Sequence, residues 1–89
     1  MNKIINDPFT AKYPRIDIHG ETTLTCIALL KSFINDNIKL KNKNIIIIHG
    51  KGSGALKKAT HEYLKTHKMV EKYYIDGLND GQTIVELKI

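Results

Sequence analysis

The stretch IIIIHGKGSG, residues 45–54, decides the fold class of this chain. Four β-branched residues in a row, 45–48, have no polar alternation, which indicates a strand that is covered on both faces. The glycine-rich segment that follows predicts a tight loop. Ligands bind outside the carboxyl ends of parallel strands in α/β sheets, so this loop is the first place to expect a site.

Helical periodicity lies on both sides of this strand. Upstream, Thr22 or Thr23 is expected to cap a helix, and downstream the pattern predicts a second helix over 55–66. The apolar face of the first helix comprises Cys26, Ile27, Leu30, Phe33, Ile34 and Ile38. The apolar face of the second comprises Leu56, Ala59, Tyr63 and Leu64. Because Cys26 falls on this stripe, we expect a core residue and not a nucleophile.

Short β-rich runs complete the pattern. RIDIHG, residues 15–20, predicts a first strand that ends at His19 or Gly20. Strands are also expected over 70–76 and 82–89, joined by a turn at 77–81. The order β-α-β-α-β-β implies that the first two strands are parallel. Residues 1–14 show no clear period, so we interpret them as a lead-in to a single domain over 15–89.

The composition limits the class of protein. A chain of 89 residues, 42% hydrophobic and 26% charged, is long enough for one compact domain and is neither disordered nor membrane-embedded. A net charge of +5 favours a polyanionic partner, although a solvated basic surface without a partner would have the same charge. One cysteine and no signal sequence lead us to expect a cytoplasmic protein without a membrane partner.

Two predicted strands each end in His-Gly, at His19 and at His49. If the strands are parallel neighbours, both imidazoles lie at one edge of the sheet. Asp17 and His19 are alternate residues and point to the same face, where a carboxylate fixes the tautomer of an imidazole and raises its basicity. We therefore expect Asp17, His19 and His49 to form a catalytic group for phosphodiester cleavage. The alternative is that the histidines are structural residues at strand ends.

The loop after His49 is suited to a phosphate. Its backbone N–H groups, a lysine and the N-terminus of the next helix together favour an anion, although a flexible connection would also be rich in glycine. The spacing matches neither a Walker A loop nor a dinucleotide fingerprint. The residues expected to contact phosphate or nucleic acid are Gly50, Lys51, Gly52, Ser53, Gly54 and Lys57.

Other polar and aromatic residues are given structural roles. His61 and His67 are expected on the surface, and of Tyr73 and Tyr74 one should face inward and one outward. The three residues of the catalytic group do not form a strong metal-ligand pattern, so no metal site is predicted. RNA cleavage by a neighbouring 2′-hydroxyl needs no metal, whereas DNA cleavage by water would be assisted by Mg²⁺ or Mn²⁺.

The motifs resemble those of a known family. DIHG at 17–20 is similar to the Asp-Leu-His-Gly signature of the Smr (small MutS-related) domain, and HGKGSGAL at 49–56 is similar to its His-Gly-Lys-Gly-x-Gly-x-Leu signature. The closing TIVEL at 83–87 fits as well, so the resemblance covers residues 15–89. It implies an α/β two-layer sandwich with a four-stranded mixed sheet, similar to the C-terminal domain of translation initiation factor three.

The resemblance also implies an activity. Smr domains are known as endonucleases that nick DNA or cleave messenger RNA on ribosomes, with the Asp-x-His motif treated as catalytic and the glycine-rich loop as substrate-binding or catalytic. Many members carry a longer glycine-rich segment before the final strand, whereas this chain has the shorter NDGQ, residues 79–82. If that segment helps to hold the substrate, we expect reduced affinity or a changed selectivity. Members that act on ribosomes or mismatched DNA also carry large additional domains. We therefore expect a domain that works alone as a monomer, finds partners, or is a fragment of a longer protein.

Three functions remain open at this point. The leading hypothesis is a nucleic-acid endonuclease, with RNA ahead of DNA and the ribosome as a further partner. The second is a non-catalytic nucleic-acid-binding module that recruits or positions another factor. The third is a module that binds small nucleotides. Substitution of His19 or His49 by alanine would separate the first two, because turnover would be lost while binding survives.

Overall fold

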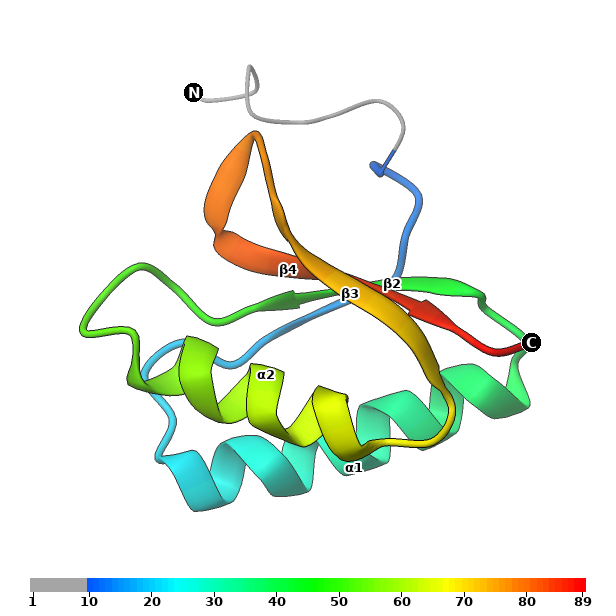
Figure 1. Ribbon diagram of the computed structural model, residues 1–89, viewed down its shortest axis with the longest axis horizontal. Coiled ribbons are helices and arrows are strands. Elements are labelled where there is room, and N and C mark those ends of the chain that lie inside the picture. Colours follow the sequence, from blue (N-terminus) through cyan, green and yellow to red (C-terminus); the bar gives the residue numbers. More distant parts are fainter. Residues whose placement is uncertain (1–9) are drawn as a thin grey trace.

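The computed structural model describes residues 10–89, and this part of the chain folds into two layers (Figure 1). One layer is a sheet of four strands and the other is a pair of helices packed side by side on one face of that sheet. In chain order the elements are β1 (Arg15–Asp17), α1 (Thr23–Lys39), β2 (Asn44–Ile48), α2 (Ala55–Thr66), β3 (Val70–Asp76) and β4 (Asn79–Leu87).

The sheet has the strand order β1-β2-β4-β3. β1 and β2 are parallel, with Asp17 opposite Ile48, whereas β2 and β4 are antiparallel, with Ile46 opposite Ile84. β3 pairs with β4 in an antiparallel hairpin. The expected order of elements, the parallel first pair and the four-stranded mixed sheet are therefore confirmed.

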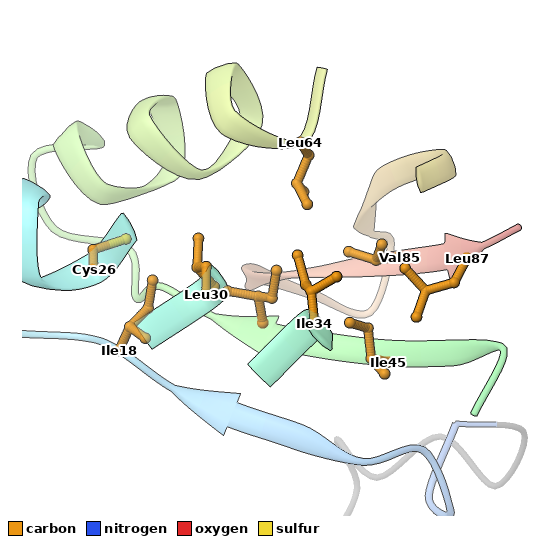
Figure 2. Packing of buried hydrophobic residues seen from close by; sticks show 9 residues of the cluster. Ile18, Cys26, Leu30, Ile34, Ile45, Leu64, Val85 and Leu87 are labelled. Carbon is orange, nitrogen blue, oxygen red and sulfur yellow. The ribbon is translucent and has the colours of Figure 1, made fainter. Parts of the chain in front are cut away.

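The core lies between the sheet and the two helices. Figure 2 shows the buried side chains of this cluster converging from both layers. Its buried members are Ile18, Cys26, Leu30, Ile34, Ile45, Ile47, Leu64, Val85 and Leu87. Cys26 is fully buried and its Sγ lies 3.7 Å from Thr60 Oγ1, so the prediction of a core cysteine is confirmed. Burial also raises the pKa of the Cys26 thiol, which keeps it protonated.

The helix boundaries follow from local chemistry. Thr22 caps α1, because its side chain accepts a hydrogen bond from the backbone N–H of Thr25. The central isoleucines of β2 are all buried although successive side chains point to opposite faces, so the prediction of a strand covered on both faces is confirmed. Tyr73 packs against the core and Tyr74 is exposed, as the alternation of strand residues required.

Two predicted boundaries were wrong. β1 ends at Asp17, because the chain turns at once, with Glu21 N–H donating to the carbonyl of Ile18. The hairpin turn is also shorter than the predicted 77–81, since β4 already begins at Asn79. The side chain of Asp76 closes this tight turn by accepting a hydrogen bond from Leu78 N–H at 2.9 Å.

The register of the hairpin is irregular just after this turn. Asp76 pairs with Asn79 but Ile75 pairs with Thr83, so the segment 80–82 of β4 bulges away from β3. This bulge carries the backbone of Gly81 toward β2.

Of the expected lead-in, residues 1–9 lie outside the described part of the chain, and 10–12 form a turn. Neither described helix has the length and apolar character that a membrane crossing requires.

Candidate nucleic-acid cleavage site

The two His-Gly segments meet at the carboxyl edge of β1 and β2, as the parallel pairing predicts. Gly50 has a φ of +82°, and a Cβ added to it would lie only 3.2 Å from the Cβ of His19. A side chain at position 50 would therefore be strained by its backbone conformation and would also press on His19. This close approach explains why glycine follows His49.

A cleft of about 510 Å³ opens beside these segments. Residues 19–23, which lead into α1, form one wall, and residues 49–57, which lead into α2, form the other. The cleft therefore contains His19, the whole glycine-rich loop and Lys57. The structure thus brings together every predicted phosphate-contacting residue, whereas Asp17 lies behind His19 and does not line the cleft.

Asp17 and His19 form the exposed pair of the site. The Nδ1 of His19 lies 2.5 Å from Asp17 Oδ1, and the backbone N–H of His19 donates to the same oxygen at 3.1 Å. The hydrogen bond that Asp17 accepts from the His19 ring, and then the negative charge of Asp17, raise the pKa of His19, and the same hydrogen bond lowers the pKa of Asp17. The side chain of His19 is 68% exposed, so its other ring nitrogen is open to a ligand.

Replacing Asp17 with asparagine is expected to lower the pKa of His19 toward its ordinary value of 6.5. The substitution removes the carboxylate charge but keeps an oxygen that can accept from the backbone N–H of His19. The pKa is measured by following the His19 ring signals by NMR between pH 5 and 9. If His19 titrates at the same pH in Asp17→Asn and in the wild type, the carboxylate does not set its basicity.

The glycine-rich loop leads into α2 without a side-chain cap. Gly54 occupies the N-cap position with a φ of +85° and contributes no side-chain hydrogen bond. The Oγ of Ser53 accepts weakly from the backbone N–H of Ala55, at 3.3 Å. The start of a helix carries partial positive charge on its N–H groups, and the basic side chains of Lys51 and Lys57 add to it. This wall of the cleft therefore favours an anion.

The bulge of β4 supports the loop from the other side. The carbonyl of Gly81 accepts hydrogen bonds from the backbone N–H groups of both His49 and Gly50, at 3.0 and 2.9 Å. A Cβ at Gly81 would lie 3.2 Å from Asn79 Oδ1 and 3.3 Å from the Cγ of Lys51, so a side chain there would require these two neighbours to shift. Next to it, Asp80 forms an exposed ion pair with Lys51 at 3.3 Å. The short segment 79–82 thus contacts the site directly.

His49 is buried, in contrast to His19, with 4% of its surface exposed. Its Nδ1 lies 3.1 Å from the carbonyl oxygen of Gly50, and its Nε2 lies 2.8 Å from Thr83 Oγ1. Desolvation by burial lowers the pKa of His49. Both ring nitrogens are therefore engaged inside the protein. This differs from the expectation that His49 offers a nitrogen to a substrate.

Sequence reasoning missed two residues at this place. His61 was expected on the surface, but it is half-buried, and its Nε2 lies 2.7 Å from Thr83 Oγ1. The expectation fails because position 61 is one turn before Leu64 on the buried face of α2. Thr83 is fully buried at an inward-facing position of β4. A threonine in such a position needs a hydrogen-bond partner, and that requirement was the available signal.

His67 was also expected on the surface, and it too is half-buried. It lies at the C-terminal cap of α2, where its Nδ1 accepts a hydrogen bond from the backbone N–H of Met69 at 3.1 Å. This contact ties the end of the helix to the start of β3. His67 therefore has a structural role away from the cleft.

Comparison with known proteins identifies the family. The family model described as "Smr domain" matches residues 16–88. The chain belongs to the Smr domain family. Among curated relatives, the endonuclease MutS2 of Geobacillus sp. (strain WCH70) is 40% identical over 76 residues, which are 82% of this chain and 10% of that protein. The endonuclease MutS2 of Finegoldia magna is 39% identical over 66 residues, or 74% of this chain and 8% of that protein. This Smr domain thus spans about a tenth of the length of these relatives.

Solved structures agree with this assignment. The Smr domain of Thermus thermophilus MutS2 superposes with a TM-score of 0.81 at 27% identity, covering 83% of this chain and 96% of that one. YdaL, a stand-alone small MutS-related protein from Escherichia coli, has the same fold, with a TM-score of 0.82 at 22% identity. That match covers 91% of this chain and 71% of YdaL. The expected family and fold class are therefore confirmed.

Proposed function

We propose that this Smr domain is a nucleic-acid endonuclease and that RNA is its substrate. The observation that carries the proposal is the exposed Asp17–His19 pair beside a cleft whose other wall favours an anion. A scissile phosphate held by Lys51 and the loop would lie within the same cleft as the open nitrogen of His19. The relatives named endonuclease MutS2 are consistent with this activity.

The chemistry assigns His19 as the general base. In its neutral form it takes the proton of the 2′-hydroxyl, whose oxygen attacks the neighbouring phosphorus while the bond from phosphorus to the 5′-oxygen breaks. The departing 5′-oxygen takes a proton from water, so the products are a 2′,3′-cyclic phosphate and a 5′-hydroxyl. Asp17 makes His19 a stronger base and stabilises the imidazolium that forms. Lys51 and the loop N–H groups balance the charge that grows on the phosphate.

The remaining predicted site residues take supporting roles in this proposal. Both ring nitrogens of His49 are engaged, so we give it the task of shaping the loop and not of moving a substrate proton. Gly50, Gly52 and Gly54 let the backbone approach the phosphate. The side chains of Ser53 and Lys57 lie on the same wall and add polar contacts.

The choice of RNA rests on the set of side chains at the site. Within residues 10–89, no three His, Cys, Asp or Glu side chains gather in a way that would hold a metal ion. Attack by the 2′-hydroxyl requires only a base and a phosphate-binding wall, and the cleft offers both. If DNA is the substrate, water must be activated instead, and Mg²⁺ or Mn²⁺ would assist.

The test uses end-labelled single-stranded RNA and supercoiled plasmid, each with chelator or with Mg²⁺ or Mn²⁺. We expect RNA cleavage in chelator, with cyclic-phosphate ends, and its loss in His19→Ala purified in the same way. Nicking of the plasmid only with metal would shift the mechanism to activated water. If both nucleic acids bind but neither is cut, the domain is a binding module, which is the second candidate. The cytoplasmic location, the monomeric state and the ribosome as a partner stay predictions.

Asp80→Asn is expected to tighten binding of a single-stranded RNA about twofold to tenfold at low salt. The substitution frees Lys51 from its ion pair and removes a negative charge beside the phosphate wall. Affinity is measured with an RNA carrying 2′-O-methyl groups, which cannot be cleaved by the proposed route. Asp36→Asn, on α1, is the matched control for net charge. Equal affinity of Asp80→Asn and the control would mean that Asp80 does not compete with the ligand for Lys51.

A further inference from the structure

A chain of hydrogen bonds, centred on the buried hydroxyl of Thr83, runs from α2 through β4 to the glycine-rich loop. We propose that Thr83 and His61 are positioning residues, which fix the tautomer of His49 and thereby hold the loop in the shape that binds phosphate. The inference deepens the proposed function and rests on it only for the phosphate as ligand. Its direct readout, the protonation of two imidazoles, is independent of cleavage.

The proton positions follow from which atoms can donate. The carbonyl oxygen of Gly50 only accepts, so the Nδ1 of His49 must carry a proton. The Nε2 of neutral His49 then accepts, and the hydroxyl of Thr83 donates to it at 2.8 Å. A hydroxyl has one proton, so Thr83 Oγ1 must accept from the Nε2–H of His61 at 2.7 Å. The direction of the whole chain is thus fixed.

The surroundings leave little freedom for another arrangement. Thr83 is fully buried, and the rings of His49 and His61 meet edge to face with centroids 6.1 Å apart. On its other side His61 contacts the ring of Tyr73, with centroids 5.0 Å apart. The hydroxyl of Thr83 is therefore the common partner of both Nε2 atoms. A side chain without a hydroxyl at position 83 would remove this partner from the buried ring of His49 and from the half-buried ring of His61, which is costly.

The chain ends on the loop itself. His49 holds the carbonyl of Gly50 through Nδ1, while the backbone N–H groups of both residues donate to Gly81. Gly50 is thereby fixed at both its N–H and its carbonyl, directly before Lys51. A change of tautomer at His49 would turn the Nδ1 lone pair toward the Gly50 carbonyl oxygen, and the two would repel. The loop would then leave its present conformation.

Protonation of His49 or His61 would also break this chain of hydrogen bonds. Burial, and then the charges of the neighbouring groups, lower the pKa of His61, and burial lowers that of His49. The charged groups that act on His49 are Lys57 from α2, which disfavours the proton, and Asp80 from β4, which favours it. On His61, His49 and Lys57 both disfavour it, and Tyr73 of β3 adds a neutral ring. The ordered chain is therefore complete above pH 6.5, the ordinary pKa, and is lost as the pH falls below that value through the lowered pKa values.

The test begins with the nitrogen signals of the histidine rings in the wild-type domain at pH 8. We expect His49 to carry its proton on Nδ1 and His61 on Nε2. Thr83→Val, which keeps the shape but removes the hydroxyl, is expected to broaden or shift the amide signals of residues 50–54. It should also weaken binding of a 2′-O-methyl RNA by about fivefold or more, as expected when a buried polar group loses its partner. Thr83→Ser restores the hydroxyl and is expected to recover most of that loss.

A second variant separates positioning from folding. His61→Gln keeps a donor for Thr83 but does not titrate. The ratio of RNA affinity at pH 5.5 to that at pH 7.5 is therefore expected to be higher in the variant than in the wild type, because protonation of His19 acts equally in both. Lys65→Ala, an exposed position of α2, controls for changes to the helix.

The outcomes separate this inference from the proposed function. The inference would be overturned if wild-type His49 carried its proton on Nε2. It would also be overturned if the Thr83→Val variant folded and bound RNA as tightly as the wild type does. If Thr83→Val does not fold, the ring tautomers and the pH dependence of His61→Gln still decide. Correct tautomers and loop effects in a domain that never cleaves RNA would leave the positioning role intact and would contradict the nuclease proposal.

Discussion

His19→Ala is expected to slow RNA cleavage by about 10²–10⁴-fold, the range that a single general base contributes. Affinity for an uncleavable RNA should change by less than about threefold, because the lysines and loop N–H groups that hold the phosphate remain. The side chain of His19 is 68% exposed, and it is paired with Asp17, whose side chain is itself 50% exposed. Stability should therefore change little.

This expectation is tested by measuring the cleavage rate at saturating enzyme and the affinity for 2′-O-methyl RNA in the same buffer. Lys65→Ala, on the exposed side of α2, is the control for purification and folding. A loss of affinity with an unchanged rate at saturating enzyme would place His19 in substrate binding alone. An unchanged rate would remove it from the mechanism, and the acid–base assignment with it.

Leu30→Ala is expected to lower the free energy of unfolding by about 2–5 kcal/mol. Leu30 is fully buried on α1, between Cys26 and Ile34 in Figure 2, so its truncation leaves a cavity between helix and sheet. A domain of this size has a free energy of unfolding of only about 4–13 kcal/mol. The midpoint of thermal unfolding should therefore fall by about 10 °C or more.

The matched control is the same substitution at Leu24 on the same helix. Leu24 is 85% exposed, so Leu24→Ala should change the free energy of unfolding by no more than about 0.5 kcal/mol. Both variants are compared by urea unfolding with circular dichroism. Equal changes in the free energy of unfolding at the two positions would mean that burial of Leu30 does not stabilise the domain more than the exposed Leu24 does.

Periodicity was enough to predict most of the fold. The apolar stripe of α1 and the isoleucines of β2 encode which side each element buries, and that information is local. The place of β4 between β2 and β3 is not local, because it depends on which strand pairs best with the exposed edge of β2. The early start of β4 at Asn79 was missed because Asp76 closes the turn through its side chain, which no period records.

The site was predicted in part for the same reason. The two His-Gly segments could be placed at one edge of the sheet, since parallel strands share that edge. Which histidine exposes a ring nitrogen to a ligand and which has both nitrogens engaged inside the protein could not be predicted, because this depends on contacts across the sheet. The Nε2 of His49 is engaged by the hydroxyl of Thr83, 34 residues later in the chain. His61 reaches the same hydroxyl because the fold places α2 beside this part of β4.

The position of β4 has a consequence for how the protein is made. The strand that contributes Gly81 and Thr83 to the loop lies inside the sheet but is the last strand of the domain (Figure 1). During synthesis, the segments that carry His19 and His49 leave the ribosome well before it. Until residues 79–87 emerge, the backbone N–H groups of His49 and Gly50 lack the Gly81 carbonyl that accepts their hydrogen bonds. A growing chain therefore has no finished site until residues 79–87 have left the ribosome.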